Sequence, residues 1–167
     1  MRLHVLEQLR WGILGKGTIS RKFASQLPGS NRGELVAVGS RNEESAIKFA
    51  NEYGGAPRSP YEGVLADMKV DAIYNSLPNS LHAEWTIRAL EAGKHVLCEK
   101  PIASHAAEAE SMFQAAERTG KRLVEAFMYR SHPAIGRFIA MVHEGAIGDL
   151  RLIRSNFTFQ RSADAKD

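Results

Sequence analysis

Short apolar runs that are typical of buried strands alternate with helical patterns along most of the chain. The pattern predicts strands over residues 10–14, 34–38, 56–58, 71–77, 95–98 and 122–127. Helices are predicted between them over residues 18–27, 42–52, 80–92 and 104–118. Parallel strands joined by helices of this length need right-handed crossovers. The alternation therefore predicts an α/β fold with a doubly wound parallel sheet and helices on both faces.

The motif Gly15-Lys16-Gly17-Thr18-Ile19-Ser20 directly follows the first predicted strand and opens the first helix. Gly15 permits a tight turn, and Gly17 lets a diphosphate approach the main chain. The unpaired N–H groups and the positive dipole end of a helix N-terminus suit a diphosphate without any side-chain charge. A Gly-x-Gly pair alone indicates only a turn. Between a strand and a helix, however, it predicts a dinucleotide site in a Rossmann fold.

Two small residues beside this motif have packing roles in our interpretation. Ser20 occupies the third position of the motif, where a small residue is needed for close contact between helix and strand, although glycine or alanine is usual. We expect its hydroxyl to hydrogen-bond to the preceding turn. Gly12 lies within the first predicted strand and indicates close backbone packing there.

The end of the second predicted strand predicts the choice of cofactor. About twenty residues past the glycine motif, where NAD enzymes place a carboxylate on the ribose hydroxyls, the sequence reads Ser40-Arg41-Asn42 and has no acidic residue. Ser40 can donate a hydrogen bond to the extra phosphate of NADP, and Arg41 can offer its planar guanidinium. The sequence therefore predicts a preference for NADP(H), with NAD as the second choice. The alternative is that Arg41 only covers the surface of the sheet.

Composition places the chain among ordinary globular domains, with 44% hydrophobic and 25% charged residues. The single cysteine, Cys98, excludes an internal disulfide and fits a reducing compartment. No run approaches the roughly 18 apolar residues of a membrane span, and residues 1–10 carry charge instead of an apolar signal core. The 22 lysines and arginines are scattered, so the net charge of +3 indicates a mixed surface and not a nucleic-acid face. We therefore expect a soluble, cytoplasmic protein without a membrane or nucleic-acid partner.

The last part of the sequence predicts the beginning of a second domain. A helix is predicted over 133–144, and residues 150–160 alternate in polarity like a strand. One face of that strand carries Ile153, Ser155, Phe157 and Phe159. A lone strand exposes its edge, so we expect it to belong to a sheet whose other strands come from elsewhere. The expected domains are an NAD(P)-binding Rossmann domain over 1–130 and, over 131–167, a linking helix and the first strand of a truncated domain.

Two further motifs follow the fourth and fifth predicted strands. They are Pro78-Asn79 with His82, and Glu99-Lys100-Pro101. In these motifs the chain resembles the Gfo/Idh/MocA family of glucose–fructose oxidoreductases, inositol dehydrogenases and MocA-type proteins, and the resemblance spans nearly the whole chain. Within that family, Ser40-Arg41 and the run 125–133 are most similar to the NADP-using glucose–fructose oxidoreductase and dihydrodiol dehydrogenase branch.

The resemblance implies an oxidoreductase that transfers a hydride between NAD(P) and a sugar, polyol or diol, with Lys100 in the active site and a cis bond before Pro101. The predicted position of Lys100 agrees, because it follows the carboxyl end of a parallel strand, where ligand crevices form. A lysine is a poor base at neutral pH without desolvation or a neighbouring cation. Otherwise it orients the substrate oxygen and stabilises negative charge there. The alternative is a surface lysine after a strand.

The expected cofactor-binding residues are Gly15, Lys16, Gly17, Thr18, Ile19, Ser40, Arg41, Leu77, Pro78, Asn79, His82, Glu99, Lys100 and Arg130. For His82 the alternative is a capping or packing role in the helix that it begins. His95 and Cys98 are interpreted as core residues rather than catalysts. The histidines show no metal-ligand spacing, so we expect no metal.

Members of the resembled family are considerably longer, and their second catalytic residue, a His or Tyr, lies beyond the stretch that matches this chain. We therefore expect an amino-terminal portion of an oxidoreductase that binds cofactor but turns over little substrate alone. Its substrate would be a small carbohydrate or diol, and the full-length form would be a homo-oligomer. The alternative is a non-catalytic cofactor-binding or interaction module that adds the 150–160 strand to a partner's sheet.

Overall fold

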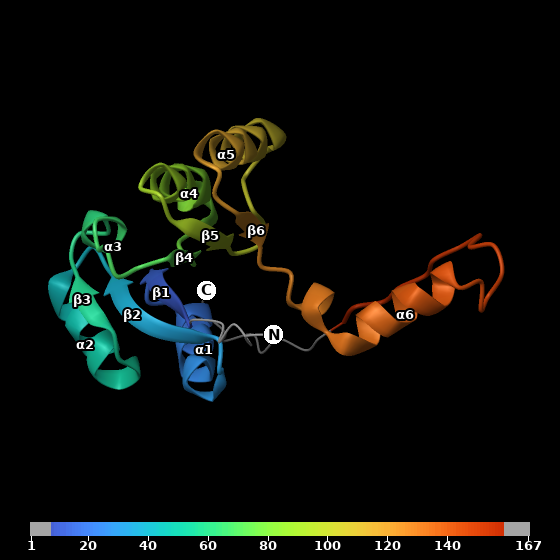
Figure 1. Ribbon diagram of the computed structural model, residues 1–167, viewed down its shortest axis with the longest axis horizontal. Helices are drawn as coiled ribbons and strands as arrows, with labels where there is room; N and C mark the ends of the chain where they lie inside the picture. The colour runs from blue at the N-terminus through green and yellow to red at the C-terminus, as the bar shows by residue number, and fades with distance from the viewer. Residues whose placement is uncertain (1–7, 159–167) are drawn as a thin grey trace, which may run out of the picture. The chain divides into compact units, whose positions relative to one another are not determined.

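The computed structural model describes residues 8–158 (Figure 1). Within them, six parallel strands form one sheet in the order β3-β2-β1-β4-β5-β6. The strands are β1 Leu9–Leu14, β2 Gly33–Gly39, β3 Ala56–Arg58, β4 Ala72–Asn75, β5 His95–Cys98 and β6 Leu123–Glu125. The doubly wound parallel sheet predicted from the sequence is therefore confirmed, although the fourth and sixth strands are shorter than predicted.

The helices between the strands are α1 Thr18–Gln26, α2 Glu43–Tyr53, α3 Glu62–Leu65, α4 His82–Glu91 and α5 Ala106–Thr119, with two short 3-10 turns, η1 Leu27–Gly29 and η2 Asn79–Leu81. The sequence pattern did not predict α3, because four residues are too few to show helical periodicity. Asn42 caps α2 as expected: its side chain accepts a hydrogen bond from the backbone N–H of Ser45 at 2.9 Å.

Two hydrophobic clusters form on the two faces of the sheet. Helices α1 and α2 cover one face, and α4 and α5 cover the other (Figure 1). Neighbouring residues of β1 point to opposite faces, so Ile13 packs with Phe49 while Leu14 packs with Ile73. Because both faces are covered, the central strands are apolar on both sides, which is why they read as continuous apolar runs in the sequence.

Gly12 in β1 confirms the packing interpretation. A Cβ atom at this position would lie 2.6 Å from Val64 Cγ1, and 3.0 Å from both Ile73 Cδ1 and Val70 Cγ1. The strand therefore has no room for a side chain on this side, and glycine is required by packing.

The chain divides into two compact units, and the second begins at Met128. In this unit η3 covers Met128–Ser131 and α6 covers Pro133–His143, whose N-cap is His132. Residues 150–158 form no strand, so the predicted strand over 150–160 is wrong for the described part, while Phe159 and Gln160 lie outside it. The physical reason is that a strand exists only with a hydrogen-bonded neighbour, and the described residues of this unit contain no other strand. Among residues 8–158, no helix is long and apolar enough to cross a membrane.

Candidate functional site

The carboxyl ends of the central strands lie level with one another at one edge of the sheet. Leu14 is in register with Gly39 of β2 and with Asn75 of β4, and Asn75 is in register with Cys98 of β5. The loops that follow these strands therefore meet at the same edge. The strand order also reverses between β1 and β4, and ligands bind at such a switch point in open α/β sheets.

Gly15 and Gly17 have different reasons to be glycine. Gly15 has φ +102°, which other residues rarely adopt, and a Cβ there would lie 3.2 Å from the carbonyl oxygen of Ser76. The predicted tight turn is confirmed. Gly17 has φ −69° and ψ 178°, which any residue adopts, and no atom lies within 4 Å of its ideal Cβ position. Neither the backbone nor the packing explains Gly17, so the open space beside it is suited to an approaching ligand.

The first turn of α1 presents its amide groups beside this open space. Gly17 is the N-cap and has no side chain to bond them, and the first helical hydrogen bond runs from the Arg21 N–H to the Gly17 carbonyl. The N–H groups of Thr18, Ile19 and Ser20 have no partner within the helix, and the turn holds no acidic residue. Unpaired amides at the positive end of a helix dipole attract phosphate.

Ser20 is fully buried, but the hydrogen bond expected from it is wrong. Its Oγ lies 2.7 Å from Ser76 Oγ, in the loop after β4, and not against the preceding turn. The Ser76 hydroxyl donates to the Leu14 carbonyl at 2.8 Å, so the proton of the Ser20 hydroxyl is the one that bridges the two serines. Ser20 therefore joins α1 to the loop that follows β4.

The loop after β2 holds the residues expected to select the cofactor. Ser40 is 4% exposed, and its Oγ accepts a hydrogen bond from the Asn42 N–H at 3.2 Å, which leaves the hydroxyl proton available. Arg41 is exposed. No carboxylate lies in the turn between β2 and the Asn42 cap, while Glu43 and Glu44 begin α2. The turn is therefore suited to an anion.

His82 links the loops that follow β4 and β5. It is fully buried, with Nε2 2.8 Å from the Leu77 carbonyl oxygen and Nδ1 2.8 Å from the Pro101 carbonyl oxygen. A neutral imidazole can donate to one of these oxygens, and a protonated one can donate to both. His82 therefore has the packing role that was the alternative from the sequence. Its side chain bonds the main chain at Leu77 and Pro101 and does not face outward.

Asn75 is buried beside His82 and bonds to the same loop, and sequence reasoning did not single out this residue. Its amide nitrogen donates to the His82 carbonyl at 3.2 Å and to Thr86 Oγ1 at 3.1 Å, and its Oδ1 accepts from the Leu77 N–H at 3.3 Å. The signal in the sequence is a polar residue at the end of the apolar run Ala72-Ile73-Tyr74. Leu77 is buried, while Pro78 and Asn79 are exposed beyond it.

Lys100 follows the carboxyl end of β5, as predicted, and the Lys100–Pro101 peptide is cis, as the family resemblance implied. The Lys100 side chain is exposed, which the alternative of a surface lysine also expects. The preceding Glu99 is held from two sides. Its Oε1 accepts a hydrogen bond of 2.6 Å from the Tyr74 hydroxyl, and its Oε2 accepts one of 3.2 Å from the Lys100 backbone N–H. Burial first, and then the bond to Glu99, raise the pKa of Tyr74 far above its usual value, so this tyrosine stays a donor. Sequence reasoning missed Tyr74.

Cys98 and His95 lie on β5 below this loop. Cys98 is fully buried, and burial is the main cause that raises the pKa of its thiol to about 12, which confirms a core residue. His95 accepts a hydrogen bond from the Arg122 N–H at 3.0 Å, and desolvation lowers its pKa. Arg130 lies in η3, in the second unit, so it is not among the residues that the first unit brings together. Among the described residues, no group of three His, Cys, Asp or Glu side chains could hold a metal ion.

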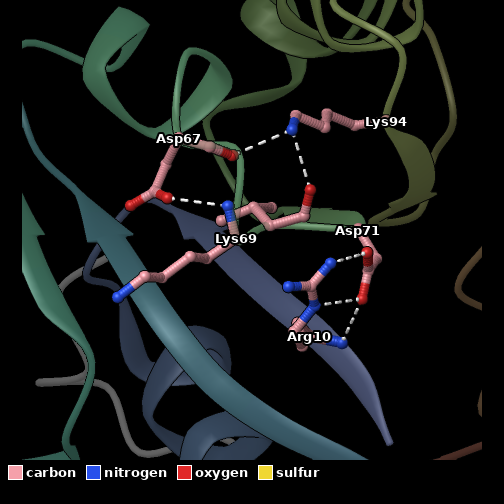
Figure 2. A network of polar contacts seen from close by, with 6 residues as sticks. Arg10, Asp67, Lys69, Asp71 and Lys94 are labelled. Atoms are coloured by element: carbon pink, nitrogen blue, oxygen red, sulfur yellow. Dashed lines mark hydrogen bonds and ion pairs between the residues drawn. The ribbon is translucent and has the colours of Figure 1, made fainter. Parts of the chain in front are cut away.

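The opposite edge of the sheet carries a network of charges (Figure 2). Lys94 is 6% exposed, and its ammonium donates to the Asp67 and Val70 carbonyl oxygens at 2.9 and 2.8 Å. Asp71 accepts from Arg10 through Nε at 2.8 Å and Nη2 at 2.6 Å, and these side-chain bonds are the main cause that lowers its pKa. These groups precede or begin their strands, so they hold the strands together at the end of the sheet opposite the carboxyl-edge loops.

The carboxyl edge therefore fits a dinucleotide. The open space at Gly17 and the uncapped first turn of α1 fit a diphosphate. The turn after β2 has no carboxylate to repel a further phosphate, and the exposed Lys100 lies at the same edge of the sheet, where ligands bind in this kind of fold.

Comparison with known proteins agrees with this geometry. Residues 9–127 match the model of the GFO_IDH_MocA oxidoreductase family, described as an NAD-binding Rossmann fold. The chain is 39% identical over 151 residues to dTDP-3,4-didehydro-2,6-dideoxy-alpha-D-glucose 3-reductase of Actinomadura kijaniata, covering 90% of this chain and 46% of that protein. It is 39% identical over 160 residues to D-xylose 1-dehydrogenase (NADP(+)) 2 of Haloferax volcanii, covering 95% and 49%.

A third relative is the mouse trans-1,2-dihydrobenzene-1,2-diol dehydrogenase, 36% identical over 159 residues that cover 92% of this chain and 47% of that protein. Among solved structures, the 3-ketoreductase of Actinomadura kijaniata in complex with NADP superposes with a TM-score of 0.78 at 38% identity, covering 86% of this chain and 46% of that one. The chain thus spans about half the length of the curated relatives that it matches. On the fold, the loop geometry and the match over residues 9–127, the chain belongs to the Gfo/Idh/MocA oxidoreductase family.

Proposed function

We propose that residues 1–130 form an NADP(H)-binding domain, and that they serve an oxidoreductase that transfers a hydride between this cofactor and a sugar, polyol or diol. The observation that carries the proposal is Gly17, whose Cβ position is open although neither backbone nor packing demands a glycine. The names of the relatives support the chemistry, since they include a dTDP-sugar 3-reductase, a xylose dehydrogenase and a diol dehydrogenase. A homo-oligomer and a cytoplasmic location belong to the same proposal.

The cofactor would lie along the carboxyl edge of the sheet. The residues from Gly15 to Ile19 would hold the diphosphate through the amides of α1. Ser40 and Arg41 would bind the 2′-phosphate of NADP, because a hydroxyl donor and a guanidinium fit that anion. Leu77, Pro78, Asn79 and Glu99 would border the nicotinamide end, with His82 fixing the position of their loops.

Lys100 is the residue that we assign to catalysis. When bound, the nicotinamide supplies or accepts the hydride. During reduction of a carbonyl, negative charge develops on the substrate oxygen, and the Lys100 ammonium would stabilise it and give that oxygen a proton. In the reverse direction, Lys100 would take the proton from the hydroxyl, for which the bound cofactor and substrate would have to desolvate the lysine. The Glu99 carboxylate, fixed by Tyr74, accepts from the Lys100 backbone N–H and holds the main chain from which the lysine extends.

Titration calorimetry of the folded chain with NADPH and NADH tests the cofactor assignment. We expect NADPH to bind at least about tenfold more tightly, which corresponds to about 1.4 kcal/mol. Folded protein that binds neither cofactor refutes the proposal, and equal or tighter binding of NADH refutes the preference. In an active enzyme that contains this domain, Lys100→Ala should abolish turnover of sugar or diol substrates and leave NADPH binding within about twofold.

The alternative is a non-catalytic cofactor-binding or interaction module whose strand over residues 150–160 would pair with a partner's sheet. Residues 150–158 are not in a strand in the single chain. Because such a strand forms only with its neighbour, this alternative stays a prediction.

A further inference from the structure

The Lys16 side chain links the loop after β1 to α2, the helix that follows the loop after β2. It leaves the main chain between Gly15 and Gly17, after β1, and its Nζ donates to Ser45 Oγ at 2.9 Å. Ser45 lies in the first turn of α2, where its own N–H is bonded by the Asn42 cap. The ends of β1 and β2 are in register, so Lys16 reaches sideways from one loop to the helix that follows the next strand.

The charge of Lys16 is not neutralised by a carboxylate. Among the ion pairs of residues 8–158, none includes Lys16 or Arg41. The hydrogen-bond partner of Lys16 is a neutral hydroxyl, which orients the ammonium without cancelling its charge. Glu43 and Glu44 begin the same helix, yet neither pairs with Lys16. Two cations from neighbouring loops are therefore left for an anion at the turn that contains Ser40.

We propose that Lys16 is a specificity-determining residue that binds the 2′-phosphate of NADP(H). The inference rests on the proposed function. It assigns Lys16 to the 2′-phosphate, whereas the sequence alone placed this residue only in the phosphate loop. Because the amides of α1 serve the diphosphate, that group needs no side-chain charge. Lys16 is bonded instead to α2, beside the end of β2, where the 2′ position of the adenosine ribose binds in this fold. A lysine binds phosphate as a point charge, and Arg41 supplies the planar fork.

The test uses the two cofactors as matched probes, since NADPH and NADH differ only in the 2′-phosphate. Dissociation constants for both are measured by titration calorimetry with the wild type, Lys16→Met, Lys16→Arg and the control Lys22→Met. Lys22 is an exposed lysine of α1, so the control removes the same formal charge nearby. We expect Lys16→Met to weaken NADPH binding about tenfold and NADH binding less than twofold, while Lys16→Arg and Lys22→Met keep the preference.

The possible results separate this inference from the proposed function. Folded wild type that binds neither cofactor refutes the proposed function, and the inference with it. Wild type that prefers NADPH, together with a Lys16→Met variant that keeps the preference, refutes the inference alone. Equal weakening of both cofactors also refutes it, because the lysine would then contact the shared diphosphate. The preference of the wild type for NADPH should also decrease at higher ionic strength, since an exposed ammonium–phosphate contact is screened by salt.

Discussion

Replacing Gly17 by alanine should separate binding from folding. The φ and ψ of Gly17, −69° and 178°, suit alanine, and no atom lies within 4 Å of the new methyl group. Alanine restricts the unfolded chain, which stabilises by about 0.4 to 1 kcal/mol, but it is a poorer N-cap than glycine. Because the two effects oppose each other, the free energy of unfolding should stay within about 1 kcal/mol of the wild type. The methyl group would, however, stand beside the amides of α1 that a diphosphate must reach. We expect NADPH affinity to fall at least about tenfold, which is about 1.4 kcal/mol.

Gly12→Ala is the matched control with the opposite expectation. Its methyl group would meet Val64 Cγ1 at 2.6 Å and the side chains of Ile73 and Val70 at 3.0 Å. Overpacking of this kind lowers the free energy of unfolding by about 1 to 3 kcal/mol. The loops at the carboxyl edge are unchanged in this variant. Urea unfolding followed by circular dichroism gives the stabilities, and calorimetry with NADPH gives the affinities of the folded variants. The reasoning fails if Gly17→Ala binds NADPH like the wild type, or if it destabilises the chain as much as Gly12→Ala does.

Three further measurements test individual groups. His82→Ala removes the ring that bridges the Leu77 and Pro101 carbonyl oxygens, with the hydrogen bond it donates, and opens a buried cavity. Urea unfolding should therefore show a loss of about 2 to 4 kcal/mol, and a loss below about 1 kcal/mol contradicts the role of this side chain as a link. Because burial raises the pKa of the Cys98 thiol to about 12, the folded chain should not react with a thiol-specific disulfide reagent at pH 8, whereas the urea-unfolded chain should react at once. Hydrogen bonds from Arg10 lower the pKa of Asp71 in the folded chain. The contribution of Asp71 to stability is therefore present above the pKa of the unfolded state, about 3.9, and is lost as the pH falls through the lower folded-state value. The stability difference between wild type and Asp71→Asn should shrink from pH 6 to pH 3, and a constant difference contradicts this.

The sequence predicted the sheet well because its central strands are buried on both faces and bounded by glycine or proline. Ile13 and Leu14 point to opposite helices, so both had to be apolar, and this made the strand visible as a continuous run. The predicted strand over 150–160 failed for the complementary reason: alternating polarity permits a strand, but only a paired neighbour creates one.

The residues of the candidate site also differ in how far the sequence alone could identify them. Gly15 and Lys100 were visible in the sequence because glycine-rich turns and strand ends leave local motifs. Tyr74 and the bond from Ser20 to Ser76 were not visible, because each acts on a residue that only the folded sheet brings near. Asn75 left a signal as a polar residue that ends an apolar run, but that signal did not predict its bond to Thr86. Long-range pairing of buried polar groups leaves no periodic signal in one sequence.

These missed contacts explain how the carboxyl edge can be both firmly held and open to a ligand. Ser20, Ser76, Asn75 and His82 hold the loops through buried or partly buried hydrogen bonds, and among the described residues no buried side-chain polar atom lacks a partner. Because this inner layer supports the main chain, the α1 amides and the exposed side chains of Arg41 and Lys100 are not needed to hold the loops. Changes in the inner layer should therefore move whole loops and weaken NADPH and NADH alike. Changes among the outward cations should alter one cofactor, or one reaction step, at a time.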